Sequence, residues 1–367
     1  MRDLFSTLSL GATTARNRLA VAPMTTSQSH ADGSASEAES AWLERLARDG
    51  YGVVITCAAA ISRTSIAFHN QMSFGDDRFL PGLTEVASRI AKHGALPIAQ
   101  LCHGGTRAIP ALTGVEAHSA SRYELPSIPG FVPPKALSVA QIEAIVEDFA
   151  QACERAARAG FAGVEFHGAN GYLFTQFIST MTNLRRDAYG GSIENRARFA
   201  REVVRACRKR VPAGFVLGFR LTFEGGPFDT GLDLDENVTV MRWLAEDGID
   251  YGHVSSLDLF APSAKHPAQT VIEYVRPRID RALPLMCAGG VMSRALADRA
   301  LELGADLVAI GRGAIGNADV PARFARGEAL RAMPYARREL EALGLSDDFL
   351  RYLTTAIPVS RLGIVEG

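Results

Sequence analysis

The sequence predicts a (β/α)8 barrel, an α/β fold in which eight parallel strands alternate with helices. Eight short apolar runs are separated by longer segments with helical periodicity along the 367 residues. This alternation is typical of a parallel sheet, and the number eight favours a closed TIM barrel. Long connections follow the apolar runs and do not precede them. The insertions therefore belong to the carboxyl-terminal face, where active sites of this fold form.

Each element can be placed by its pattern. We expect the strands at 19–24, 52–58, 96–101, 163–166, 216–221, 251–254, 285–288 and 307–310. We expect the helices near 38–48, 81–93, 138–159, 193–210, 235–247, 268–280, 293–303 and 319–326. Ser138, with Gln141 three positions later, predicts a capping box, and Ser293 predicts an N-cap. Glycine is expected to end four helices in the left-handed conformation, at Gly50, Gly94, Gly160 and Gly304.

The connections suggest a single domain over residues 1–367 with long loops at the carboxyl-terminal face. Residues 103–137 are rich in Pro, Gly and Ser, and we expect them to form a capping or substrate loop. Residues 328–367 are expected to be a partly helical C-terminal tail in which Phe349 and Tyr352 fold back on the barrel.

Composition narrows the function classes. A formal net charge of −1 gives no reason to expect nucleic acid or an anionic membrane as partner. The five cysteines are scattered and form no Cys-x-x-Cys, so we expect no metal site or disulfide framework. Neither a signal peptide nor a membrane-spanning segment is apparent, which favours a cytoplasmic setting. We expect a monomer or a homo-oligomer such as a dimer.

Polar side chains gather at the predicted strand ends. His167, Asn170 and Tyr172 follow the fourth strand, and Gln100 ends the third. Two of the trio can hydrogen-bond one oxygen atom and the third can give up a proton. Arg220 lies in the fifth strand, where it needs an anionic ligand or a salt bridge, with Glu165 as one option.

Glycines close the seventh and eighth strands, at Gly289-Gly290 and at Gly311-Arg312-Gly313. Backbone N–H groups there can approach an anion, and a phosphate site made by these two loops recurs in the fold. Simple tight turns are the alternative reading, and the sequence leaves the two nearly even.

The chain resembles the Old Yellow Enzyme family of FMN-dependent ene-reductases over nearly its whole length. The matching segments are Asn17-Arg18-Leu19, Ala22-Pro23-Met24-Thr25, Gln100-Leu101-Cys102-His103, Ala159–Leu173, Asn183–Phe199 and Ala309-Ile-Gly-Arg312. The block from 159 to 199 is the most specific.

The resemblance implies FMN bound without a covalent link at the barrel mouth and reduced by NADPH or NADH. It implies flavin contacts from Pro23, Met24, Thr25, Ala58, Gln100, His167 and Arg220, and phosphate contacts from Gly289, Gly290, Gly311 and Arg312. By the same resemblance, His167 and Asn170 would bind the carbonyl oxygen of an activated alkene. Tyr172 would protonate its α-carbon as a general acid. An electrophilic alkene, such as an α,β-unsaturated carbonyl or nitro compound, is then the expected small-molecule substrate.

Two positions depart from the family pattern. The usual His-x-Gly-Arg reads His103-Gly-Gly-Thr106, with the arginine displaced to Arg107, and Cys57 stands where an acidic residue is common. Two other functions are alternatives to alkene reduction. A non-redox phosphate-binding lyase or isomerase would need a lysine or a carboxylate pair at the strand ends, and the few lysines fall in predicted helices or loops. A flavin-binding protein without turnover is the other alternative.

Overall fold

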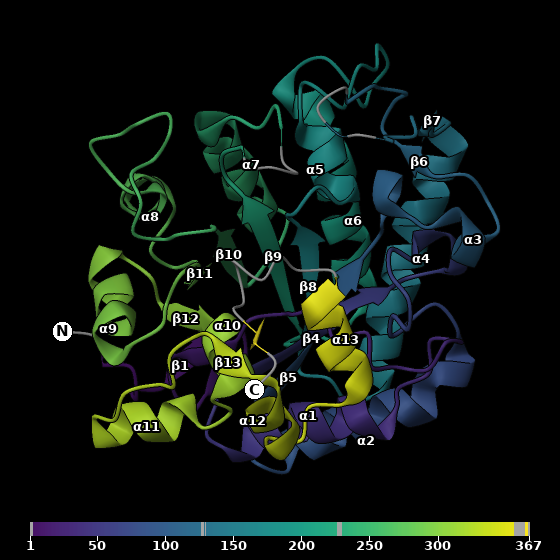
Figure 1. Cartoon of the computed structure of the whole chain (residues 1–367). Coiled ribbons are helices and arrows are strands. Elements are labelled where there is room, and N and C mark those ends of the chain that lie inside the picture. The colour runs from purple at the N-terminus through teal and green to yellow at the C-terminus, as the bar shows by residue number, and fades with distance from the viewer. Residues whose placement is uncertain (1–2, 126–127, 129, 226–229, 356–363, 366–367) are drawn as a thin grey trace.

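Eight parallel strands close into a barrel with the helices on its outside, as Figure 1 shows. The computed structural model describes residues 3–125, 128, 130–225, 230–355 and 364–365. The barrel strands are β3 (Leu19–Val21), β4 (Val53–Ala60), β5 (Leu96–Cys102), β8 (Gly163–Gly168), β9 (Val216–Thr222), β10 (Tyr251–Ser255), β11 (Leu285–Ala288) and β12 (Leu307–Ile310). Each coincides with one expected apolar run, so the predicted (β/α)8 barrel is confirmed.

The outer helices also lie where the periodicity placed them. They are α1 (Glu37–Arg48), α2 (Leu80–Ala91), α4 (Val139–Arg158), α6 (Ile193–Arg210), α7 (Leu234–Glu246), α8 (Val271–Val275), α9 (Arg294–Leu303) and α11 (Val320–Arg326). Helix α8 is shorter than expected and continues as a 3-10 turn, Arg276–Arg278. Pro277 has no N–H to donate, which limits the α-helix there.

The predicted helix caps and helix-terminating glycines are present. Ser138 and Gln141 form the reciprocal capping box of α4, and the Ser293 hydroxyl accepts from Leu296 N at 3.2 Å. The four glycines expected to end helices all have positive φ, between +74° and +120°. These local signals fix where each helix stops and therefore how the following strand enters the barrel.

The barrel interior contains a buried polar cluster centred on Glu165. Gly218 leaves the space in which the ring of Tyr251 lies, because a Cβ there would overlap that ring. The Tyr251 hydroxyl reaches Glu165 Oε2 at 3.0 Å, and His253 Nδ1 lies 2.9 Å from the same atom. Gln100 Nε2 donates to Glu165 Oε1 at 2.8 Å. A buried carboxylate with three partners thus occupies the centre of the barrel.

Smaller elements surround the barrel, and two of them are helices in the tail 328–367, which was expected to be partly helical. The smaller elements are β1 (Leu8–Leu10), β2 (Thr13–Ala15), β6 (His118–Ser119), β7 (Lys135–Ala136), β13 (Tyr335–Ala336), β14 (Ile364–Val365), α3 (Pro110–Thr113), α5 (Leu173–Ile178), α10 (Arg312–Gly316), α12 (Arg337–Ala342) and α13 (Asp347–Thr355). The β1–β2 hairpin precedes the first barrel strand, so one insertion lies outside the expected face. Lys135 lies in the two-residue strand β7 and not in a loop.

The predicted capping loop 103–137 and tail 328–367 are only partly covered: 126–127, 129, 356–363 and 366–367 lie outside the described residues. The division into one domain stays a prediction. Among the helices of the described residues, none combines the length and the apolar character needed to cross a membrane.

Candidate active site

A cavity of about 430 Å³ opens at the carboxyl ends of the barrel strands. The residues after β3 and β11 contribute to it, and so do Arg220 of β9 and the segment after β12. Eight of the predicted cofactor residues line it: Pro23, Met24, Thr25, Arg220, Gly289, Gly290, Gly311 and Arg312. The structure therefore brings together residues that are separated by almost 300 positions in the sequence.

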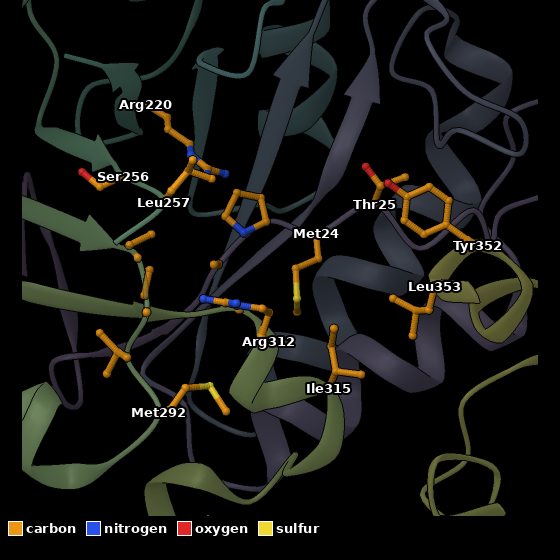
Figure 2. Close-up of a pocket in the computed structure, with 18 of the residues that line it drawn as sticks. Met24, Thr25, Arg220, Ser256, Leu257, Met292, Arg312, Ile315, Tyr352 and Leu353 are labelled. Carbon is orange, nitrogen blue, oxygen red and sulfur yellow. The ribbon is translucent and has the colours of Figure 1, made fainter. Parts of the chain in front are cut away.

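The two glycine segments form one side of this cavity. Gly289 has φ +148° and Gly290 has φ +72°. A Cβ on Gly289 would lie 2.7 Å from the carbonyl oxygen of Ser256, so no other residue fits that backbone. At Gly311 the nearest side-chain atom to an added Cβ is 3.7 Å away. Arg220 and Arg312 both point into the cavity (Figure 2). Two guanidinium groups beside exposed backbone give the cavity an electropositive lining.

Helix α13 closes another side. Phe349, Tyr352 and Leu353 line the cavity, and Tyr352 lies across it from Ser256 and Leu257 (Figure 2). The ring of Phe349 packs edge-on against Trp42 of α1, with centroids 5.5 Å apart. The expected fold-back of Phe349 and Tyr352 is confirmed. It results from an apolar face of α13 that packs on the outer helix α1.

The turn after β8 brings His167 and Tyr172 together. Asn170 and Gly171 both have positive φ, +59° and +73°. The chain therefore does not continue helically after His167, and His167 and Asn170 do not share a helical face. Instead the two left-handed residues reverse the chain, and the Tyr172 ring lies 4.8 Å from the His167 ring, centroid to centroid. Asn170, which is half-buried, occupies the turn between them.

Burial sets the charge of this pair. His167 is 3% exposed, and desolvation, with Arg220 and Arg107 nearby, lowers its pKa well below the usual value. The imidazole is therefore neutral near pH 7. Its buried Nδ1 has no hydrogen-bond partner among the described residues. Burial also raises the pKa of Tyr172, against the opposing charge of Arg107. Tyr172 is thus a phenol that holds its proton until it is given a strong acceptor.

Arg220 connects the cavity with this pair. It lies directly opposite His167 in the β8–β9 register, and its Nε donates to Ser255 Oγ at 3.1 Å. Burial raises the pKa of Glu165, but His253, Arg220 and Gln100 together more than offset this, so that its pKa lies below the usual value. Glu165 was the partner considered for Arg220 from the sequence. In the structure its negative charge interacts with the positive charge of Arg220 inside the barrel.

Three predicted cofactor residues lie outside the cavity lining: His167, described above, Gln100 and Ala58. Gln100 is 1% exposed, and its carboxamide binds Glu165. The Ala58 carbonyl accepts from Gln71 Nε2 at 2.8 Å, and its side chain packs with Cys102 and Tyr172. Ala58 is therefore next to Tyr172. The predicted contacts of Ala58 and Gln100 with a cofactor stay predictions.

Three apolar residues of the cavity wall carried no signal in the sequence. Met292, Ile315 and Leu353 line the cavity with apolar surface that is indistinguishable by pattern from core. Gln176 ties two loops together: its Nε2 donates to Gly171 O at 2.7 Å, and its Oε1 accepts from Thr106 N at 3.1 Å. Within the described ranges, no three His, Cys, Asp or Glu side chains gather as metal ligands.

The sequence is similar to those of known flavin oxidoreductases. Residues 3–331 match the model of the NADH:flavin oxidoreductase / NADH oxidase family. The chain is 35% identical to a probable NADH-dependent flavin oxidoreductase of Bacillus subtilis over 305 residues, which cover 82% of this chain and 81% of the relative. Two other relatives are longer proteins, of which the chain spans 37% and 51%.

Solved structures show the same fold. Morphinone reductase superposes with a TM-score of 0.82 at 30% identity, over 94% of this chain and 96% of the other. An old yellow enzyme homologue from Zymomonas mobilis gives a TM-score of 0.81 at 26% identity, over 94% and 98% of the two chains.

Proposed function

The chain belongs to the NADH:flavin oxidoreductase / NADH oxidase family, which includes the old yellow enzymes, and from this premise we propose that it reduces the activated C=C bond of α,β-unsaturated carbonyl or nitro compounds. Enzymes of this family are NAD(P)H-dependent oxidoreductases that use FMN. The observation that carries the finer proposal is the Tyr172–His167 pair beside the electropositive cavity.

The residues present fit FMN. The cavity volume is within the range of about 300–1,000 Å³ that small-molecule sites occupy. Arg312 and the glycines after β11 and β12 suit a phosphate, and Val291, Met292 and Ile315 suit an apolar ring system. The orphaned Nδ1 of His167 needs a partner, since buried polar atoms are nearly always hydrogen-bonded. Thr25 and Arg220 would complete the contacts to the cofactor. Bound FMN supplies the hydride that NAD(P)H provides.

His167 and Asn170 would bind the substrate. A neutral imidazole donates one hydrogen bond and a carboxamide donates two, so both can hold a carbonyl or nitro oxygen. Negative charge grows on that oxygen during the reaction, and preplaced donors in a buried site stabilise it more than water does. Arg220 adds positive charge on the same side.

Tyr172 would supply the proton. Its hydroxyl is the acidic group next to His167, and burial keeps it protonated at neutral pH. Transfer breaks the Tyr172 O–H bond and forms a C–H bond at the α-carbon, which general acids promote by about 10² to 10⁴. The buried site limits access of water to the reacting atoms.

The lyase or isomerase alternative finds no support in the cavity. Among the described residues that line it there is no lysine and no carboxylate, the groups on which Schiff-base or enolisation chemistry depends. A flavin protein without turnover remains the competing proposal, and the experiment that follows separates the two.

The test uses the purified protein with its flavin. Anaerobic NADPH or NADH should bleach the yellow colour, and 2-cyclohexenone should restore it with formation of cyclohexanone. Colour restored by oxygen but by none of a panel of enones, maleimides and nitroalkenes would contradict alkene reduction. A colourless protein that takes up no FMN would contradict the site assignment itself.

A further inference from the structure

Arg107 is placed against both ends of the turn that carries the proposed proton donor. Its guanidinium carbon lies 4.8 Å from the centroid of the Tyr172 ring. Its Nη1 donates to the backbone carbonyl of Asn170 at 2.6 Å. One arginine therefore contacts the face of the phenol and the left-handed residue that sets the direction of Tyr172.

The segment that carries Arg107 is itself tied to this turn. Arg107 ends a 3-10 turn, Gly105–Arg107, directly after β5. Gln176 accepts from Thr106 N and donates to Gly171 O, so the two loops share one carboxamide. Gly105 has φ +60°, and a Cβ there would overlap that carboxamide. The backbone geometry of this loop thus fixes the position of Arg107, the arginine that is displaced from the usual motif position.

The charge of Arg107 acts on a phenol that is poorly solvated. Tyr172 is 6% exposed, so the anion formed on loss of its proton receives little help from water. Arginine stays charged at all relevant pH values. A cation over the ring therefore stabilises the phenolate anion more than it stabilises the neutral phenol. As a structural contact, an exposed cation–π pair contributes only about 0.5–1 kcal/mol, so its loss should leave the fold intact.

We propose that Arg107 is a positioning residue for proton transfer, which holds the Tyr172 ring and stabilises the phenolate left after the proton has moved to the substrate. This inference rests on the proposed function. The O–H electron pair stays on the phenol oxygen, the α-carbon gains the proton, and the phenolate regains a proton from water.

The test measures the phenol directly and needs no turnover. The protein is labelled with 2,3,5-trifluorotyrosine, whose phenol is several pKa units more acidic than that of tyrosine, and the 19F resonances of Tyr172 are assigned by their loss in Tyr172→Phe. In Arg107→Met the pKa of this phenol should rise by about one unit, the low end of the effect of a nearby opposite charge. Arg107→Lys, which keeps the charge, should recover part of the shift.

A matched control is available elsewhere in the chain. Arg278 lies over the ring of Tyr274 at 3.6 Å and donates to the Tyr274 carbonyl at 2.8 Å, and neither residue lines the site cavity. Arg278→Met should leave the titration of Tyr172 unchanged. An equal titration of Tyr172 in Arg107→Met and in the parent would overturn the inference.

Single-turnover kinetics test the same idea in the reaction. Alkene reduction should slow about 10-fold in Arg107→Met, in line with one pKa unit, with bleaching by NAD(P)H unchanged. An equal slowing of both half-reactions would overturn the inference. Failure of the parent to reduce any activated alkene would overturn the proposed function, whereas the 19F titration still reports on Arg107.

Discussion

The Tyr172 ring lies 4.8 Å from the His167 ring, with the two planes inclined at 51°. His167 ends the inward-facing row of β8, and Tyr172 is the N-cap residue of α5, after two left-handed residues. An imidazole fixed by the sheet and a phenol fixed by the turn therefore share one site.

Tyr172→Phe removes the proton donor and keeps the ring. We expect alkene reduction to slow by about 10² or more, the usual contribution of a general acid, while bleaching by NAD(P)H changes little. Stopped-flow measurement of the two half-reactions checks this. Tyr274→Phe, which changes a tyrosine outside the cavity lining, is the control. Equal losses in both half-reactions would rule out the proton-donor role.

His167→Ala removes a buried donor to the substrate oxygen. We expect the charge-transfer band given by a bound phenol to disappear and the apparent Kd for that phenol to rise by about 10- to 100-fold, as for a charge-assisted hydrogen bond. Absorbance titration of the flavoprotein measures both. The proposal for His167 fails if the band and the Kd are retained.

Arg312→Met should weaken retention of FMN. The side chain points into the cavity, and a charge-assisted bond to phosphate contributes about 1.5–3 kcal/mol, or roughly 10- to 100-fold in Kd. Equilibrium dialysis of the apoprotein with FMN gives the affinity. Arg326→Met, which removes an exposed arginine paired with Glu328, should have no effect. Similar affinities for all three proteins would place the phosphate elsewhere.

Glu39 should make stability depend on pH. Burial, opposed by the Thr26 hydroxyl, raises the pKa of Glu39 from 4.5 to about 7. Between these values the folded protein keeps a proton that the unfolded chain has lost, so the free energy of unfolding falls as pH rises and levels off above pH 7. The shift corresponds to roughly 3 kcal/mol.

Urea unfolding of the parent and of Glu39→Gln at pH 5, 6, 7 and 8 isolates this contribution as the difference between the two proteins. The parent should lose stability relative to the variant over this range. Glu37→Gln changes an exposed carboxylate on the same helix and should follow the parent. A constant difference between parent and Glu39→Gln across the range would contradict the prediction.

Phe349→Ala should loosen the wall that α13 provides. Phe349 is fully buried against Trp42, and a large-to-small change of this kind costs about 3–5 kcal/mol. We expect a lower Tm together with lower flavin retention, because α13 also carries Tyr352 and Leu353 to the cavity. Thr355→Ala, at the exposed end of α13, is the control. Normal flavin retention in a destabilised Phe349→Ala protein would separate α13 from the site.

The sequence by itself determined the barrel and most of its element bounds. The apolar runs at 52–58 and 216–221 predicted the buried strands Val53–Ala60 and Val216–Thr222, and capping residues such as Ser138 act within one turn of their own helix. Such signals are local, so they can be read without the fold. The glycines after β11 and β12 could also be singled out from the sequence, because glycine by itself indicates where the backbone can approach a ligand.

The tertiary structure alone decided what converges on the site. The left-handed Asn170–Gly171 turn, the stacking of Arg107 on Tyr172 and the docking of α13 through Phe349 each join segments that no periodicity connects. Gln100 also binds Glu165 inside the barrel, because the inward-facing rows of neighbouring strands place them side by side, and its expected contact with a cofactor stays a prediction. Side-chain direction at strand ends depends on turn geometry and on packing between distant segments, and neither is encoded in residue spacing.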